Sequence, residues 1–289
     1  NAPGNDMRYS DDKVKAARNF ANKLWNASRF IMMNLPEDFQ YNGLPEDLEL
    51  EDRWIVSKFN AVAKEVGENL DKFEIGVASA KIYDFIWDVY CDWYIELTKP
   101  RIQAGGATME KAQAVLVWVM RGMLKLLHPF MPFITEEIFC NIQDEEESIM
   151  ISDWPVYKEE WSFKQDENAV DTIKAAVRAI RNLRTGMNVP PSKKATVYVV
   201  SAKSEIRDIF EASKNFFATL GYASEVFIQD SKNGIDENAV STLIHDAALY
   251  IPLAELVDIA KEVERLQKEE ERLTKELVFH EYIIVSLTF

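Results

Sequence analysis

Residues 10–35 read SDDKVKAARNFANKLWNASRFIMMNL and decide the fold of the first half of the chain. The apolar residues of this stretch recur every three or four positions. At about 100° per residue, Phe20, Leu24 and Ile31 therefore fall on one side of a helix. Ser10 can cap the start of that helix, and Pro36 follows its end. The stretch predicts a long amphipathic helix whose apolar side faces a core.

The opposite side of this helix carries long donors and amides, which we call the basic ridge: Lys15, Arg18, Asn22, Asn26 and Arg29. Between Arg8 and Arg29 there are six Lys or Arg and two Asp, whereas the whole chain has a net charge of −15. Cations and amides that share one side of a helix suit phosphates and base edges. The alternative interpretation is a merely solvated helix face.

The composition excludes several classes of function. A net charge of −15 argues against a general nucleic-acid coat protein, so that any contact with a polyanion must be local. Cys91 and Cys140 lie far apart in the sequence, which predicts neither a disulfide framework nor a metal site. The longest uncharged candidate for a membrane span, residues 112–120, has about half the length that a bilayer requires. We expect a cytoplasmic protein without membrane contact.

Further helical patterns follow the first one. Apolar spacing predicts helices over residues 52–70 and 74–99, the latter ending before Pro100, and a fourth helix that begins near Thr108. Connections of moderate length between long helices favour an antiparallel bundle. The first half of the chain is therefore expected to be a helical domain over residues 11–150.

The block at residues 128–138 interrupts the fourth helix with two prolines and begins another helix. His128 opens this block, but no nucleophile or metal-type cluster accompanies it. We therefore interpret His128 as a packed, hydrogen-bonded histidine at a helix break, and we assign no catalytic residue.

The second half begins with a helix expected over residues 165–187. Its cationic flank forms a possible secondary basic patch made of Lys174, Arg178, Arg181 and Arg184, with a solvated helix face as the alternative. Strand formers over residues 195–201 and 223–229 enclose a helix expected at 205–220, and residues 240–251 can add further pairing. The pattern predicts a linker helix and a small α/β module over residues 151–254.

The last unit, residues 255–289, begins with a heptad stripe from Leu256 to Leu277 that predicts a short coiled-coil helix. Residues 278–289 are instead apolar and strand-like, which makes the tail look truncated or altered.

Three blocks of this sequence resemble the helical anticodon-binding domain of class I aminoacyl-tRNA synthetases, and most closely those specific for valine. The blocks are residues 18–30, Cys91-Asp92-Trp93-Tyr94 together with Lys99-Pro100, and residues 128–138. The resemblance implies a mainly α fold, in which an antiparallel bundle precedes the α/β module and the coiled-coil helix. Residues 4–9 look like the segment that joins such a bundle to a catalytic core. We therefore expect residues 1–10 to end a junction to a catalytic domain that this chain lacks.

This resemblance implies that the chain binds the anticodon stem and loop of tRNA(Val) through the basic ridge. It makes Phe39 and Tyr41, two aromatics in the acidic loop after the first helix, candidates for stacking on an unpaired base. It also implies as partners the catalytic and editing domains of the same protein, in a monomer.

No segment resembles the nucleotide-binding motifs of the family's catalytic domain, where ATP is used. We therefore expect no cofactor and no aminoacylation by this chain alone. Two alternatives remain at this point. One is a helical protein-interaction module without RNA binding, and the other is the equivalent domain of an isoleucyl-, leucyl- or methionyl-tRNA synthetase.

Overall fold

The computed structural model describes residues 9–142, 146–257 and 267–277. These residues form two compact units, which divide between Asp171 and Thr172. Each unit is considered by itself. Among the described residues, no helix has the length and apolar content needed to cross a bilayer.

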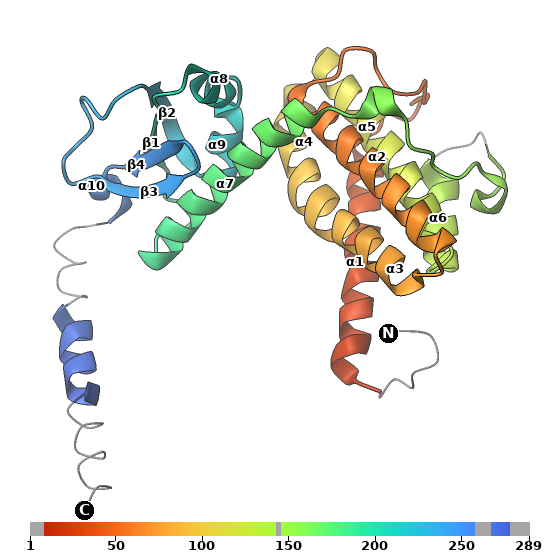
Figure 1. Cartoon of the computed structure of the whole chain (residues 1–289), viewed down its shortest axis with the longest axis horizontal. Helices are drawn as coiled ribbons and strands as arrows, with labels where there is room; N and C mark the ends of the chain where they lie inside the picture. The colour runs from red at the N-terminus through yellow and green to blue at the C-terminus, as the bar shows by residue number, and fades with distance from the viewer. Residues whose placement is uncertain (1–8, 143–145, 258–266, 278–289) are drawn as a thin grey trace, which may run out of the picture. The chain divides into compact units, whose positions relative to one another are not determined.

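The first unit is a helical bundle (Figure 1). Its elements are α1 (Asp11–Met33), α2 (Leu50–Asp71), α3 (Ile75–Asp84), the π-helix η1 (Phe85–Tyr94), α4 (Ile95–Ala104), α5 (Gly106–Leu127) and α6 (Pro132–Ile142), with short 3-10 turns η2 (Ile149–Ile151) and η3 (Glu159–Trp161). Helix α2 packs against α3 and α5, and α4 packs against α5. Large side chains such as Trp54, Tyr90 and Phe139 are fully buried in the core. The predicted helical bundle is confirmed.

Helix α1 enters the core only over its second half. Phe20, Leu24 and Ile31 are buried as the apolar spacing predicted. Residues 11–19 are instead exposed on every side. In Figure 1 this first part of α1 extends beyond the neighbouring helices. The helix therefore holds its last turns against the bundle and presents its first turns to solvent.

The prediction that a helix ends before Pro100 was wrong. Helices α3, η1 and α4 follow one another without a break, and Pro100 lies inside α4. The next residue, Arg101, is buried, and its Nη1 lies 2.8 Å both from Glu51 Oε1 and from Asp52 Oδ1. Contacts with α2 thus hold the last turn in place although proline removes one backbone donor.

Residues 151–171 belong to the first unit, so the units divide later than the boundary expected at residue 150. Asn60 of α2 holds this segment through two hydrogen bonds, one from its Nδ2 to the Lys158 carbonyl (2.7 Å) and one from the Lys158 N–H to its Oδ1 (2.8 Å). Further on, Ser57 Oγ donates to Glu167 Oε1 at 2.6 Å, and Lys58 Nζ lies 2.9 Å from Glu167 Oε2. An apparent surface linker is therefore fastened to α2 by buried polar groups.

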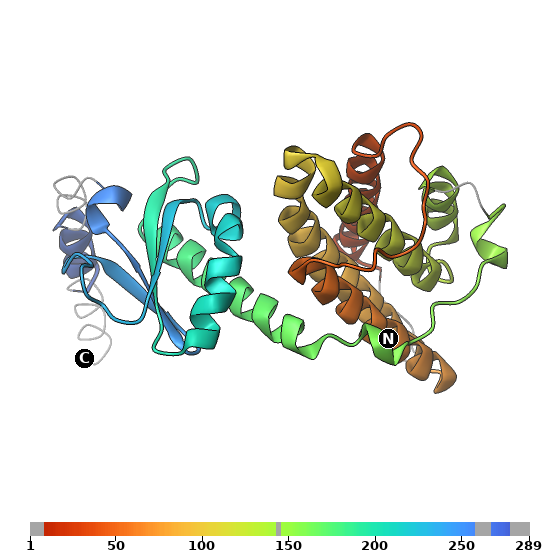
Figure 2. The ribbon, with the colours of Figure 1, turned by 90° about the horizontal axis from the view of Figure 1, so that it is seen from above.

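The second unit is built on a four-stranded sheet in the order β2-β1-β4-β3 (Figures 1 and 2). Its strands are β1 (Ala195–Val200), β2 (Ala223–Gln229), β3 (Val240–Ile244) and β4 (Ala247–Ile251), and its helices are α7 (Lys164–Gly186), which begins in the first unit, α8 (Ser204–Ala212), α9 (Lys214–Leu220) and α10 (Leu253–Leu256). Strands β1 and β2 are parallel, and the other pairs are antiparallel. Val197, Val199 and Leu249 are buried on one face of the sheet. The predicted α/β module is confirmed.

Two sequence expectations in the second unit need comment. The single helix expected at 205–220 is interrupted at Ser213, whose Oγ donates to the Ile209 carbonyl at 2.6 Å. Residues 258–266 of the predicted coiled coil and the whole tail, residues 278–289, lie outside the described residues, as do residues 1–8. Residues 267–277 are helical, with Leu273 and Leu277 exposed.

Candidate nucleic-acid interface

All five residues of the basic ridge are exposed on α1. Lys15 and Arg18 stand on the part of α1 that extends into solvent, whereas Asn22, Asn26 and Arg29 lie opposite the buried side of the helix. Lys15 Nζ approaches Asp12 Oδ1 at 3.9 Å, but both side chains are largely exposed, so that this pair does little to neutralise the lysine. The ridge is thus accessible to an anionic partner.

A stack of aromatic rings lies on the buried side of α1, where α1 meets α3 and η1. The ring centroids of Phe20 and Tyr83 are 4.6 Å apart, and those of Tyr83 and Trp87 are 5.7 Å apart with an interplanar angle of only 8°. Lys23 Nζ lies 3.8 Å from the centroid of Trp87 and 2.6 Å from Asp92 Oδ1. The edge of this stack is open to solvent, because Tyr83 is 38% exposed.

This stack was not anticipated from the sequence. The available signal was the spacing of Tyr83 and Trp87, which are four residues apart and therefore share one helix side. Spacing within one helix does not show which other helix that side meets, so the contact with Phe20 and Lys23 of α1 required the structure. Base stacking on exposed rings beside cations is a common mode of single-stranded nucleic-acid binding.

Phe39 and Tyr41 are both half-buried rather than freely exposed. Phe39 lines a hollow with residues of α5, among them Glu110 and Gln113. The ring centroid of Tyr41 lies 4.6 Å from the guanidinium of Arg121, also on α5. Both aromatics thus pack at least partly against the bundle, and their role in stacking on a base stays a prediction.

The secondary basic patch is not brought together as one exposed surface. Arg184 is buried, and its Nη2 donates to the carbonyls of Pro190 (3.0 Å) and Lys193. Arg181 Nε donates to the Leu220 carbonyl at 2.8 Å. Including Arg184 in a surface patch was therefore wrong, because its guanidinium satisfies carbonyl groups of the loop after α7. Arg178 is exposed, and Lys174 is half-buried.

A family model described as the anticodon-binding domain of tRNA ligase matches residues 52–199. The chain belongs to this family. A valine–tRNA ligase of Clostridium acetobutylicum is 48% identical over 281 residues, which cover 96% of this chain and 32% of that protein. The valine–tRNA ligase of Clostridium tetani is 49% identical over 273 residues, covering 92% of this chain and 30% of the relative.

This chain thus spans about a third of the length of the curated valine–tRNA ligases that it matches, and it corresponds to the region that holds their anticodon-binding domain. The resemblance drawn from the three sequence blocks is confirmed. Among solved structures, the ternary complex of Agrobacterium radiobacter K84 agnB2 LeuRS, tRNA and LeuAMS gives a TM-score of 0.41 at 18% identity, over 54% of this chain and 18% of that one.

Within the anticodon-binding domain, His128 has the structural role that its context predicted. Its Nδ1 lies 2.7 Å from Thr135 Oγ1, across the break between α5 and α6. Thr135 is buried and also donates to the Met131 carbonyl at 2.8 Å. In the part of the chain that the structure describes, no three His, Cys, Asp or Glu side chains are grouped as a metal site would require.

Proposed function

We propose that this chain binds the anticodon stem and loop of tRNA(Val) as the anticodon-binding region of a valine–tRNA ligase. The observation that supports this proposal most directly is the exposed basic ridge of α1 on a chain of net charge −15. A polyanion is repelled by such a chain on average, so a cationic helix side offers it a defined place to bind. The relatives' name supplies the amino-acid specificity that we propose.

In this proposal, the cationic residues and the amide residues of the ridge contact different parts of the RNA. Lys15, Arg18 and Arg29 contact phosphates, which fixes the position of the RNA without reading its sequence. Asn22 and Asn26 have both donors and acceptors and can bond to base edges or ribose hydroxyls. All five side chains are reachable from solvent in the structure.

The aromatic stack adds a place for an unpaired base. A base that packs against the exposed part of Tyr83 gains up to about 1–3 kcal/mol of contact free energy. Lys23 beside Trp87 can then exchange its partner Asp92 for a phosphate. Phe39 and Tyr41 remain further candidates for stacking.

Aminoacylation with ATP belongs, in this proposal, to the catalytic domain of the parent enzyme, which together with its editing domain is the natural partner of this chain. The complete enzyme would act in the cytoplasm as a monomer. The chain by itself binds RNA and attaches no amino acid.

Filter binding of purified tRNA(Val), tRNA(Ile) and tRNA(Met) to the chain tests the proposal. If the three cations of the ridge contact phosphates, the logarithm of the affinity should fall with the logarithm of the salt concentration at a slope of about −2 to −3. The double variant R18E/R29E should bind tRNA(Val) at least about tenfold more weakly at low salt and show a shallower slope.

A matched control makes the same change in net charge on another helix of the same unit. Lys64 on α2 and Lys72 at its end are both exposed. The variant K64E/K72E should bind nearly as well as the wild-type chain. Equal losses in the two double variants, or no tRNA binding by the wild type, would contradict the proposal and favour a protein-interaction module.

A further inference from the structure

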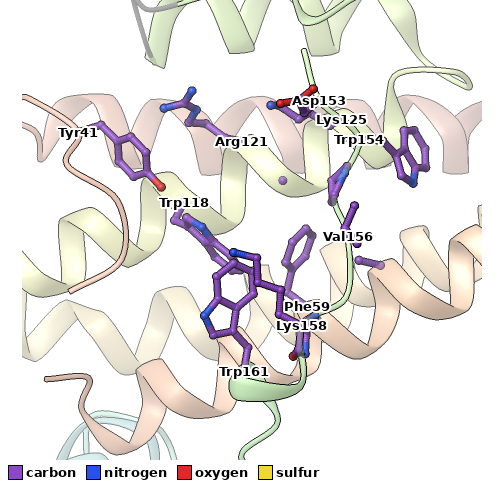
Figure 3. A pocket seen from close by; sticks show the side chains of 14 residues that line it. Tyr41, Phe59, Trp118, Arg121, Lys125, Asp153, Trp154, Val156, Lys158 and Trp161 are labelled. Carbon is purple, nitrogen blue, oxygen red and sulfur yellow. Dashed lines mark hydrogen bonds between the residues drawn. The ribbon is translucent and has the colours of Figure 1, made fainter. Parts of the chain in front are cut away.

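The first unit contains a cavity of about 400 Å³ that is lined by Tyr41 but by no residue of the basic ridge (Figure 3). It lies between α2, α5 and the extended segment at residues 153–161. Small-ligand sites in proteins commonly have volumes of about 300–1,000 Å³, so this cavity is large enough for a small organic molecule.

One end of the cavity is aromatic. The Trp118 ring lies edge-on to Phe59, with centroids 5.3 Å apart, and edge-on to Trp161, with centroids 5.0 Å apart. Ala63 and Gly122 contribute little volume here. A Cβ atom on Gly122 would overlap the ring of Phe59, so that glycine is required for the present packing. Trp118 and Trp161 line the cavity and are both partly exposed, so that a planar ring can pack against their indoles.

The other end is cationic. Arg121 and Lys125 lie one turn apart on α5 and line the cavity, and Figure 3 shows both on the opposite side from Trp161. Arg121 Nη2 and Lys125 Nζ lie 3.7 and 3.5 Å from the same oxygen, Glu146 Oε1. Arg121 and Lys125 thus place two positive charges at this end of the cavity.

The walls of the cavity are held in place without a ligand. Asn60 binds both the N–H and the carbonyl group of Lys158, which fixes the segment that carries Trp161. Lys158 Nζ in turn lies 4.3 Å from the centroid of Trp161. A preformed site loses little conformational entropy on binding.

We propose that this cavity binds a nucleotide, with the base at Trp118 and Trp161 and the phosphate at Arg121 and Lys125. A nucleotide matches both ends, because it combines a flat aromatic ring with a dianionic group that Arg121 and Lys125 can bind. Asp153, which also lines the cavity, can accept a hydrogen bond from a ribose hydroxyl or an amino group of the base.

Titration calorimetry of the chain with AMP, adenosine and inorganic phosphate tests this proposal. We expect AMP to bind with saturation, and adenosine and phosphate each to bind more weakly because each fills only one end of the cavity. K125Q should weaken AMP about tenfold and leave adenosine unchanged. W161L should weaken AMP and leave phosphate unchanged. K72Q, an exposed lysine remote from the cavity lining, is the control and should bind AMP like the wild type.

The nucleotide could be free in solution or part of an RNA strand, and two further titrations separate these sources. A trinucleotide that binds more tightly than AMP, together with loss of AMP binding in the presence of saturating tRNA(Val), indicates a nucleotide of RNA. AMP binding that tRNA leaves unchanged indicates a free nucleotide. Either result supports the site.

The absence of saturable AMP binding up to about 1 mM would overturn the proposal, as would phosphate binding as tightly as AMP, because the aromatic end would then contribute nothing. This test is independent of the proposed ridge contacts, since R18E/R29E should lose tRNA binding and keep AMP binding.

Discussion

Replacing Arg101 with methionine should destabilise the helical unit strongly. Arg101 Nη1 lies 2.8 Å from both Glu51 Oε1 and Asp52 Oδ1, and the three side chains are only 10%, 6% and 0% exposed. Tyr94 donates to the same Asp52 oxygen at 2.7 Å. Methionine fills a similar volume but leaves two carboxylates without their cation in a buried place. The cost of breaking such a buried pair is about 3–5 kcal/mol.

The pH dependence of this loss gives the reasoning a second test. Burial, followed by the neighbouring charge of Asp52, already raises the pKa of Glu51, and Arg101 acts against that rise. Without Arg101 the pKa of Glu51 should rise further. A carboxyl group whose pKa is higher in the folded than in the unfolded state contributes most to folding stability below its unfolded pKa, which is about 4.3 for Glu. That contribution is lost as the pH rises through the pKa of the folded state. The deficit of R101M should therefore be largest near neutral pH and shrink toward about pH 4.5.

Urea unfolding followed by tryptophan fluorescence measures this deficit in the correct unit, because all seven tryptophans lie at or before residue 161. The variant R29M, at an exposed arginine of α1, is the matched control and should change the free energy of unfolding by less than about 0.5 kcal/mol. A deficit in R101M below about 1 kcal/mol, or one that does not change with pH, would refute the argument.

Other predictions concern single positions. G122A should cost about 1–3 kcal/mol of stability in urea unfolding, because the new methyl group overlaps the buried ring of Phe59; an unchanged midpoint would contradict this packing. Burial raises the pKa of the Cys91 thiol to about 12, so iodoacetamide should label the exposed Cys140 in the folded chain and reach Cys91 only after unfolding, as peptide mass spectrometry can show. Burial acts to raise the pKa of Glu167, but hydrogen bonds from one serine and two lysines lower that pKa to about 2. E167Q should therefore cost about 1–3 kcal/mol of unfolding free energy at pH 7, and progressively less as the pH falls from about 4.5 toward 2. A cost that does not change with pH would exclude a charge effect.

The sequence was sufficient to predict features that depend only on residues near one another in the sequence. The apolar spacing of Phe20, Leu24 and Ile31 predicted the buried side of α1, and strand 223–229 was predicted at its observed bounds. Such patterns repeat the period of the element that carries them, so they are readable within a short window. The same helical period also predicts the basic ridge, because the ridge is the side of α1 opposite the buried apolar residues.

Features that depend on contacts between distant segments could not be predicted in this way. Helix α4 continues past Pro100 because Arg101 meets two carboxylates that precede it by about fifty residues. Arg184 turns inward because the loop after α7 presents carbonyls to it. The rings of Tyr83 and Trp87 find Phe20 across more than sixty residues of sequence. In each case the position of the side chain is set by a contact with another segment of the chain, and not by the sequence pattern around the residue.

The placement of the basic ridge on an otherwise acidic chain also bears on kinetics. If the ridge binds RNA as proposed, an RNA molecule that approaches an acidic side of the protein meets like charge and diffuses away, whereas one that approaches α1 is attracted. The negative charge of the rest of the chain therefore shortens collisions in which RNA does not face α1, without preventing binding at α1. In this proposal, charge orients the RNA at the moment of collision, before any base is read.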